Sequence, residues 1–105
     1  NIAMEMALTG DTIDAARAHQ HGLVNLLCEP DGAIEAAKEL AERINANAPL
    51  AVRATRKAVL DGALVSDEDG IRIAVELFGP VAVSEDAKEG PLAFVEKRPP
   101  EWKAR

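Results

Sequence analysis

Apolar residues recur at helical spacing along most of this chain. The clearest case is residues 33–47, where Ile34, Ala37, Ala41 and Ile44 recur every three or four positions. Charged residues occupy the opposite face, as in an amphipathic helix. The pattern predicts a helix over the whole of this segment.

The first 22 residues hold two shorter helical patterns separated by glycine. Residues 1–8 are typical of the end of a helix closed by Gly10, and they have no capping residue before them. Asp11 is the expected cap of a second helix over residues 12–20, which Gly22 ends. The apolar stretch that follows has no partner strand elsewhere in the chain.

The second half holds three further segments with recognisable starts. Pro49 begins the first of them, Ser66 caps the next and Ser84 caps the last. Pro80 and Pro91 fall inside helical patterns, so we expect a break or kink at each. The chain is therefore predicted to be all-α, with five or six helices.

The segment capped by Ser66 is apolar around most of its circumference. A helix of this kind is normally buried on more than one side. In so small a chain we expect the second side to face another subunit or a domain that this chain lacks. The apolar positions are Ile71, Ile73, Ala74, Val75, Leu77 and Phe78.

Composition narrows the class of protein. The 105 residues are 48% apolar, but 20 of them are alanine and only three are aromatic, so the expected core is thin. A net charge of −6 disfavours nucleic acid as a partner, and no apolar run has the length of a membrane span. One cysteine, Cys28, excludes an internal disulfide and favours a cytoplasmic location.

The acidic residues do not form an evident catalytic pair. Residues 67–69 and 85–86 stand at predicted helix N-termini, where capping and the helix dipole explain them. Glu89 is better explained as a buried hydrogen-bond anchor than as a catalytic base.

No metal ligands or activated nucleophile emerge either. His19 and His21 point in different directions near a helix end, and Cys28 has no neighbouring base. We expect Cys28 to be a small buried apolar side chain. The chain is thus predicted to contain no catalytic residue and no metal site.

One stretch near the end, EGPLAFVEKRPP, places Phe94 three residues before a Lys97-Arg98 pair. Phe94 can be a core residue, and a basic final turn complements the negative end of a helix dipole. Alternatively, Phe94 lines an apolar cavity and Lys97 meets a phosphate at its rim, as an acyl thioester of coenzyme A would require. The spacing alone leaves both interpretations open.

The order of these pieces closely resembles the C-terminal part of enoyl-CoA hydratases of the crotonase superfamily. The resemblance lies in AMEMALTGDTIDAARAHQHGLVNLLCE, in ANAP, in a helix carrying Lys57, and in SEDAKEGPLAFVEKRPPEW. It implies the helical C-terminal, oligomerisation region of a crotonase-like α/β spiral-fold subunit whose spiral core is absent from this chain. Residues 1–10 would end a helix continuing from that core, and residues 11–105 would form the helical region.

The resemblance also implies a function. The complete enzyme would hydrate 2-trans-enoyl-CoA to 3-hydroxyacyl-CoA in fatty-acid β-oxidation, without a cofactor, as a trimer or dimer of trimers. Its two catalytic glutamates would precede Asn1, so this chain alone is expected to be inactive. Phe94 would border the acyl pocket and Lys97 would bind a coenzyme A phosphate. The alternatives are a sibling activity such as enoyl-CoA isomerisation, or a stand-alone helical self-association module without catalysis.

Overall fold

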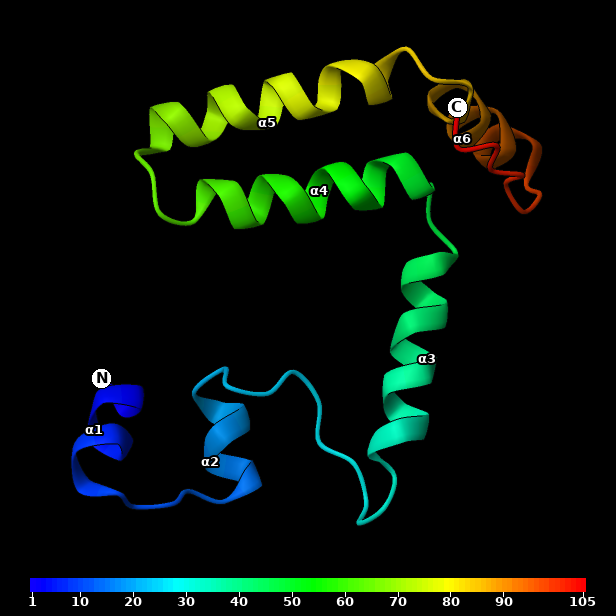
Figure 1. Cartoon of the computed structure of the whole chain (residues 1–105). Coiled ribbons are helices and arrows are strands. Elements are labelled where there is room, and N and C mark those ends of the chain that lie inside the picture. Colours follow the sequence, from blue (N-terminus) through cyan, green and yellow to red (C-terminus); the bar gives the residue numbers. More distant parts are fainter. The chain divides into compact units, whose positions relative to one another are not determined.

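The computed structural model describes residues 1–105 as six helices without a strand, which confirms the predicted all-α class (Figure 1). The chain divides into two compact units, residues 1–40 and 41–105, with the division inside the third helix. The helices are α1 (Ile2–Thr9), α2 (Ala15–Gln20), α3 (Ala33–Asn45), α4 (Pro49–Gly62), α5 (Asp67–Ala82) and α6 (Glu85–Glu96).

The first unit contains α1, α2, the loop that follows them and most of α3. Gly10 ends α1 with a φ of 76°, a conformation that glycine adopts without steric cost. The expected cap of α2 was wrong: the helix begins three residues later, and Asp14 caps it by accepting a hydrogen bond from the Arg17 N–H at 2.7 Å. Asp14 is the later of two possible caps, and its geometry satisfies a free N–H of the first turn.

The third helix ends at Asn45, two residues before the predicted end. The Asn47 side-chain amide donates hydrogen bonds to the carbonyls of Arg43 and Ile44, at 2.8 and 3.3 Å. These carbonyls belong to the last turn and lack partners within the helix. Asn47 therefore closes α3 from outside it.

In the second unit, α4 and α5 pack side by side as an antiparallel pair (Figure 1). Two glycines allow a close approach: a Cβ added at Gly62 would lie 3.8 Å from the Gly70 Cα. Ser66 caps α5 as predicted, since its side chain accepts a hydrogen bond from the Asp69 N–H.

The two internal prolines do not interrupt their helices, which corrects the expectation of a break. Pro80 lies inside α5, and Pro91 lies inside α6. Each follows a glycine, Gly79 or Gly90. A proline ring normally clashes with the Cβ of the preceding residue and drives it out of the helical region, but glycine has no Cβ. The helix therefore continues, at the cost of one backbone hydrogen bond.

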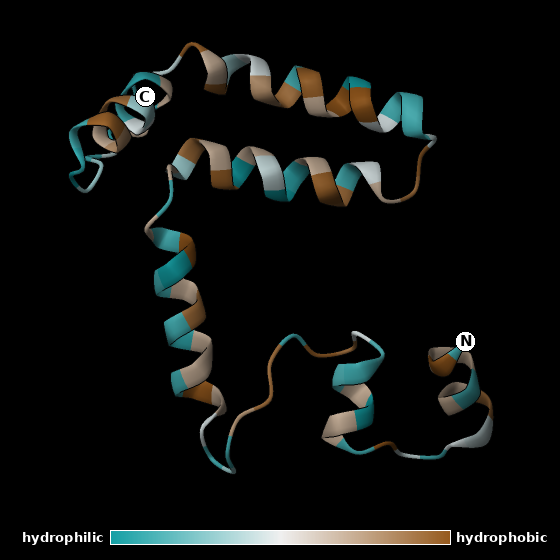
Figure 2. Cartoon of the chain, turned by 180° about the vertical axis from the view of Figure 1, so that it is seen from behind, coloured by the Kyte–Doolittle hydropathy of each residue, from teal (hydrophilic) through white to brown (hydrophobic).

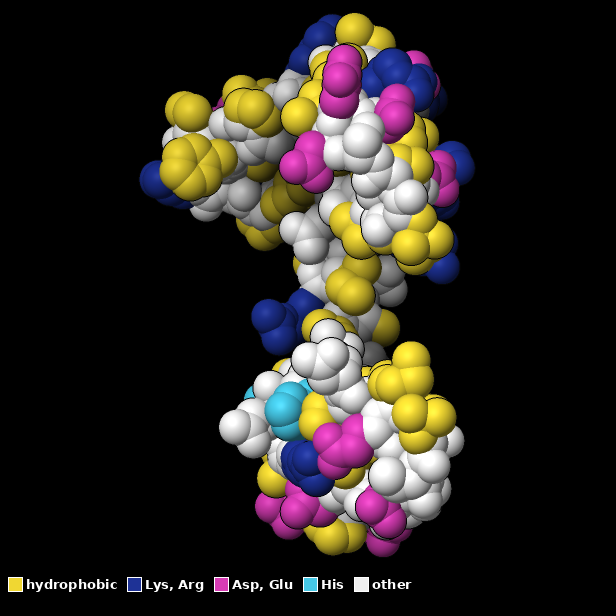
Figure 3. Space-filling view, turned by 90° about the vertical axis from the view of Figure 1, so that its left-hand side faces the viewer, with side chains coloured by type: hydrophobic (Ala, Val, Ile, Leu, Met, Phe, Trp, Pro, Cys, Tyr) yellow, Lys and Arg dark blue, Asp and Glu magenta, His cyan; other side chains and the backbone are white.

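The core of the described chain is small. Ala54 and Ala93 are its only buried apolar residues, joined by two buried polar residues, Ser84 and Asp86. Many large apolar side chains are exposed instead, which Figure 3 shows as yellow atoms on the surface. Hydrophobic and hydrophilic residues alternate along α3, α4 and α5 (Figure 2). Side chains of this kind are normally covered by other protein.

The structure bears on two expectations of burial, one for α5 and one for Cys28. Ile71 and Val75 on α5 are each 67% exposed, so only one side of that helix is covered. Cys28 is exposed, not buried as expected. None of the six helices combines the length and apolar composition needed to cross a bilayer.

Candidate functional site at the end of α6

Phe94 and Lys97 lie together on the surface at the end of α6. The Phe94 ring is 73% exposed, and the Lys97 Nζ lies 4.4 Å from the centre of that ring. At this distance the ammonium is attracted to the negative face of the ring. Lys97 takes part in no ion pair within the chain, whereas its neighbour Arg98 forms two. The pair thus presents an apolar face and an uncompensated cation side by side.

Lys97 is not in the final turn of the helix, as the sequence suggested, but one residue beyond it. It adopts the left-handed conformation, with φ 56° and ψ 36°, and ends α6 at Glu96. The Lys97 N–H donates to the Phe94 carbonyl, and the Arg98 N–H donates to the Ala93 carbonyl at 3.1 Å. This is the hydrogen-bond pattern of a Schellman motif, which glycine usually completes.

A non-glycine residue in this conformation costs roughly 1–2 kcal/mol, because its Cβ approaches the backbone. Such strain persists where the surrounding contacts fix the backbone. At Lys97 those contacts come from the C-terminal tail, residues 97–105, which folds back on α6 (Figure 1).

Glu89 is the first anchor of that tail. Its carboxylate accepts hydrogen bonds from both terminal nitrogens of Arg98 and, at 2.7 Å, from the Glu101 N–H. The Glu89 side chain is only 17% exposed. The Arg98 guanidinium, followed by the Glu101 N–H, lowers the pKa of Glu89 to about 2. This confirms Glu89 as a hydrogen-bond anchor.

Asp86 is a second anchor, which the sequence analysis missed by explaining it through the helix dipole alone. It is 3% exposed and accepts hydrogen bonds from the Lys103 N–H at 2.6 Å and the Ala104 N–H at 3.1 Å. Its partners are backbone groups 17 and 18 residues away, so no spacing of side chains could indicate them. The Glu85 N–H also donates to the Arg105 carbonyl, at 2.7 Å.

Trp102 secures the middle of the tail. Its indole Nε1 donates to the Ala46 carbonyl at 2.9 Å, and its ring lies against α6 at Gly90. A Cβ added at Gly90 would lie 3.4 Å from the ring, at the short end of van der Waals contact. Gly90 therefore leaves room for the edge of the indole ring beside the helix and also permits Pro91 to follow within it.

The remaining candidates do not assemble into a site. His19 lies in the last turn of α2 and His21 follows its end, in agreement with a role near the helix terminus. No group of three or more His, Cys, Asp or Glu side chains could hold a metal ion. Asp69 accepts hydrogen bonds from Arg72 and Ser66, which lower its pKa and keep it a carboxylate at the start of α5.

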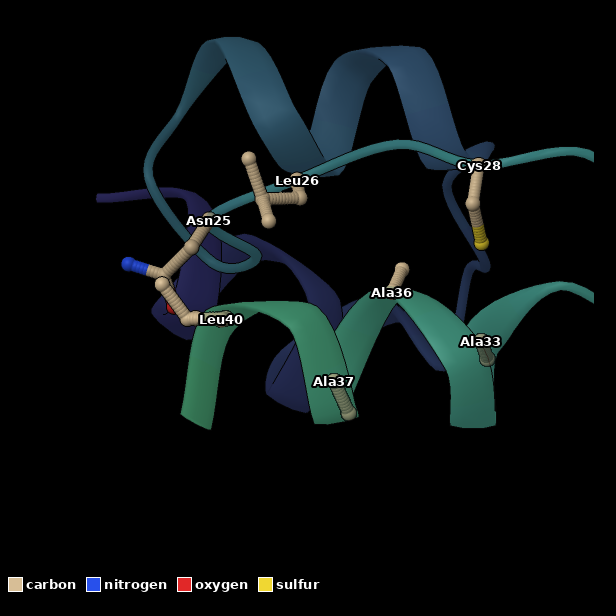
Figure 4. A pocket seen from close by; sticks show the side chains of 7 residues that line it. All are labelled: Asn25, Leu26, Cys28, Ala33, Ala36, Ala37 and Leu40. Atoms are coloured by element: carbon tan, nitrogen blue, oxygen red, sulfur yellow. The ribbon is translucent and has the colours of Figure 1, made fainter. Parts of the chain in front are cut away.

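A shallow pocket in the first unit lies between the loop before α3 and the helix itself (Figure 4). The Cys28 side chain points toward α3, but no carboxylate, lysine, arginine or histidine lines the pocket. Such a surface offers apolar contact and no acid–base chemistry. Its lining residues are Asn25, Leu26, Cys28, Ala33, Ala36, Ala37 and Leu40.

Comparison with known proteins identifies the class to which this helical chain belongs. The family model for enoyl-CoA hydratase/isomerase matches residues 1–105. The chain is 40% identical over 105 residues to enoyl-CoA hydratase EchA19 of Mycobacterium tuberculosis, covering 99% of this chain and 39% of that protein. It is 39% identical over 108 residues to carnitinyl-CoA dehydratase of Proteus mirabilis, covering 99% and 41%.

Solved structures agree with the sequence matches. The chain superposes on enoyl-CoA hydratase EchA1 from Mycobacterium marinum with a TM-score of 0.93 and 48% identity, covering 99% of this chain and 41% of that one. For enoyl-CoA hydratase from Bacillus anthracis the TM-score is 0.94 at 34% identity, with coverage of 100% and 41%. The chain belongs to the enoyl-CoA hydratase/isomerase, or crotonase, family, and it spans about two fifths of the length of these relatives.

Proposed function

We propose that this chain is the C-terminal helical region of an enoyl-CoA hydratase-type enzyme, which converts 2-trans-enoyl-CoA to 3-hydroxyacyl-CoA in fatty-acid β-oxidation. The chain would supply contacts between subunits and one wall of the acyl-CoA pocket. The family match over all 105 residues supports this proposal. The observation that carries it is the exposed Phe94 ring with the unpaired Lys97 ammonium 4.4 Å from its centre.

The pair fits an amphipathic, phosphorylated ligand. The Phe94 ring offers apolar surface to an acyl chain, and Lys97 offers a compact cation to a phosphate. Neither group is an acid or base at the reacting double bond, so both would contribute binding and not chemistry. The hydration step would depend on carboxylates outside this chain, and residues 1–105 by themselves would be inactive.

The exposed face of α5 supports the assembly role. Ile71 and Val75 lie one helical turn apart, and both are largely exposed. A second copy of the complete enzyme would cover such a face, in a trimer or a dimer of trimers. A self-association module without catalysis would use the same face, and that alternative needs no role for Phe94 or Lys97.

The precise reaction stays open between sibling activities. The relatives include hydratases named for different acyl-CoA substrates and a carnitinyl-CoA dehydratase. Enoyl-CoA isomerisation is a further sibling on the same family scaffold. All of these enzymes would share the contact between Lys97 and a coenzyme A phosphate. A variant of Lys97 therefore tests that contact, and the choice of acyl substrate needs a separate assay.

The test is Lys97→Ala in the complete enzyme that carries this chain, assayed with crotonyl-CoA. A charge-assisted hydrogen bond contributes about 1.5–3 kcal/mol, so KM should rise roughly 10-fold or more. The kcat should change less than about 2-fold, because binding remote from the reacting bond is shared by ground and transition states. Lys88→Ala is the matched control, since Lys88 is an exposed lysine of α6, the helix that Lys97 ends, and forms no ion pair. An unchanged KM in Lys97→Ala would remove Lys97 from the site and favour the non-catalytic module.

A further inference from the structure

We propose that Glu89 is a positioning residue for Lys97: by holding the tail on both sides of Pro99 and Pro100, it keeps Lys97 in the left-handed conformation with its ammonium beside Phe94. The inference rests on the proposed function and deepens it, because it says what places the coenzyme A-binding cation. Glu89 itself would touch no substrate.

The contacts of Glu89 fall on the residues that follow Lys97. Its carboxylate accepts a two-pronged contact from the Arg98 guanidinium, and its Oε1 also accepts the Glu101 N–H at 2.7 Å. One side chain thus fixes the tail at the residue directly after Lys97 and again three residues later. A two-pronged arginine–carboxylate pair restricts orientation as well as distance.

The segment between these two points is stiff. Pro99 and Pro100 fix their own φ angles, and the Arg98 Nη1 donates to the Pro99 carbonyl at 3.1 Å. Arg98 also donates from Nε to Glu96, on the other side of Lys97, at 2.6 Å. The Arg98 guanidinium therefore contacts residues on both sides of Lys97, and Glu89 holds that guanidinium in place.

Without these contacts, Lys97 would be held only by the backbone hydrogen bonds that end α6 and by tail anchors farther along, at Trp102 and residues 103–105. Its own side chain makes no ion pair, and the left-handed conformation is unfavourable for a residue with a Cβ. Release of residues 98–101 from Glu89 would let Lys97 return to helical or extended backbone and carry its ammonium away from Phe94. The fraction of molecules with a correctly placed cation would fall, and the apparent affinity for the ligand would fall with it.

The experiment is a double-mutant cycle in the complete enzyme, using Glu89→Gln, Lys97→Ala and the double variant. Coenzyme A binding by calorimetry and the steady-state constants for crotonyl-CoA are the readouts. Glu89→Gln should weaken coenzyme A binding about 5- to 10-fold, as expected for loss of a conformational restraint, with kcat little changed. The double variant should bind no more weakly than Lys97→Ala alone, because Glu89 acts through Lys97.

Two further variants test whether the loss of binding comes specifically from the Glu89–Arg98 contact. Glu101→Gln alters a carboxylate of the same tail whose side chain contacts only Lys103, so it should bind coenzyme A normally. Arg98→Lys keeps the charge but loses the two-pronged geometry, so it should reproduce the loss seen in Glu89→Gln. It also serves as the test if Glu89→Gln does not fold.

The outcomes separate this inference from the proposed function. If Lys97→Ala binds coenzyme A normally, the proposed site is wrong and the inference falls with it. If Lys97→Ala binds weakly but Glu89→Gln and Arg98→Lys bind normally, only the positioning role is overturned. If the losses of Glu89→Gln and Lys97→Ala add fully, Glu89 acts on the ligand by another route and the positioning role is again overturned.

Discussion

At the scale of single residues, Glu89 connects α6 to the tail through contacts that all require its negative charge. Arg98 and the Glu101 N–H donate to it, and together they hold its pKa at about 2, well below the ordinary 4.5. The folded state therefore binds the Glu89 proton more weakly than the unfolded chain does. The stabilisation from Glu89 is fully present above about pH 4.5 and is lost as the pH falls from there toward 2.

This predicts a pH-dependent difference between the wild-type protein and Glu89→Gln. The free energy of unfolding should differ by a constant amount between pH 5 and 7, and the difference should shrink as the pH falls from about 4.5 to 2. Denaturant titrations followed by circular dichroism at each pH measure it. A difference that stays constant down to pH 2 would show that the Arg98–Glu89 contact does not form in solution.

At the scale of the helices, local signals predicted most of the starts, whereas distant contacts decided how α6 ends. Ser66 and Ser84 were identified correctly because a cap depends on an N–H only three residues away. Pro91 was expected to break or kink its helix, but α6 continues through it, because the preceding Gly90 has no Cβ to clash with the proline ring. The left-handed Lys97 could not be predicted, since it depends on Glu89 and on a tail that folds back by way of backbone hydrogen bonds. Pairing Phe94 with Lys97 was possible from their spacing, whereas the tail anchor Asp86 was not.

The two serine caps predict different costs on removal. The Ser84 hydroxyl is buried, accepts from the Ala87 N–H and donates to the Val81 carbonyl at 2.7 Å, joining the end of α5 to the start of α6. Ser66 is exposed, and its hydroxyl bonds only to Asp69. Ser84→Ala should cost about 2 kcal/mol of stability and Ser66→Ala about 1 kcal/mol or less. Chemical denaturation of both variants beside the wild-type protein measures this, and equal costs would show that the Val81 contact contributes nothing.

At the scale of the whole chain, the small core and the exposed apolar side chains point to stability gained from other protein. Only Ala54 and Ala93 are buried apolar residues, and the two sides of α5 differ in their exposure. Ile73 and Leu77 are half-buried within the second unit, whereas Ile71 and Val75 are exposed. The sequence showed that α5 is apolar nearly all round, but it could not separate the side that packs inside the chain from the side that is left exposed.

That separation gives the last prediction, made for the complete enzyme. Ile71→Glu with Val75→Glu should dissociate the oligomer and leave the helical content nearly unchanged, because the new carboxylates would be solvated in the monomer and buried without partners at an interface. Ile73→Asp with Leu77→Asp should instead unfold the packing of α5 and lower the helical content. Arg72→Ala with Glu76→Ala is the control, since it removes only the exposed ion pairs that Arg72 forms with Asp69 and Glu76 on the same helix and should leave the assembly intact. Light scattering gives the mass and circular dichroism the helicity. An oligomer that survives Ile71→Glu with Val75→Glu would show that subunits meet elsewhere, and the exposed face of α5 would then have to be covered by another part of the same subunit.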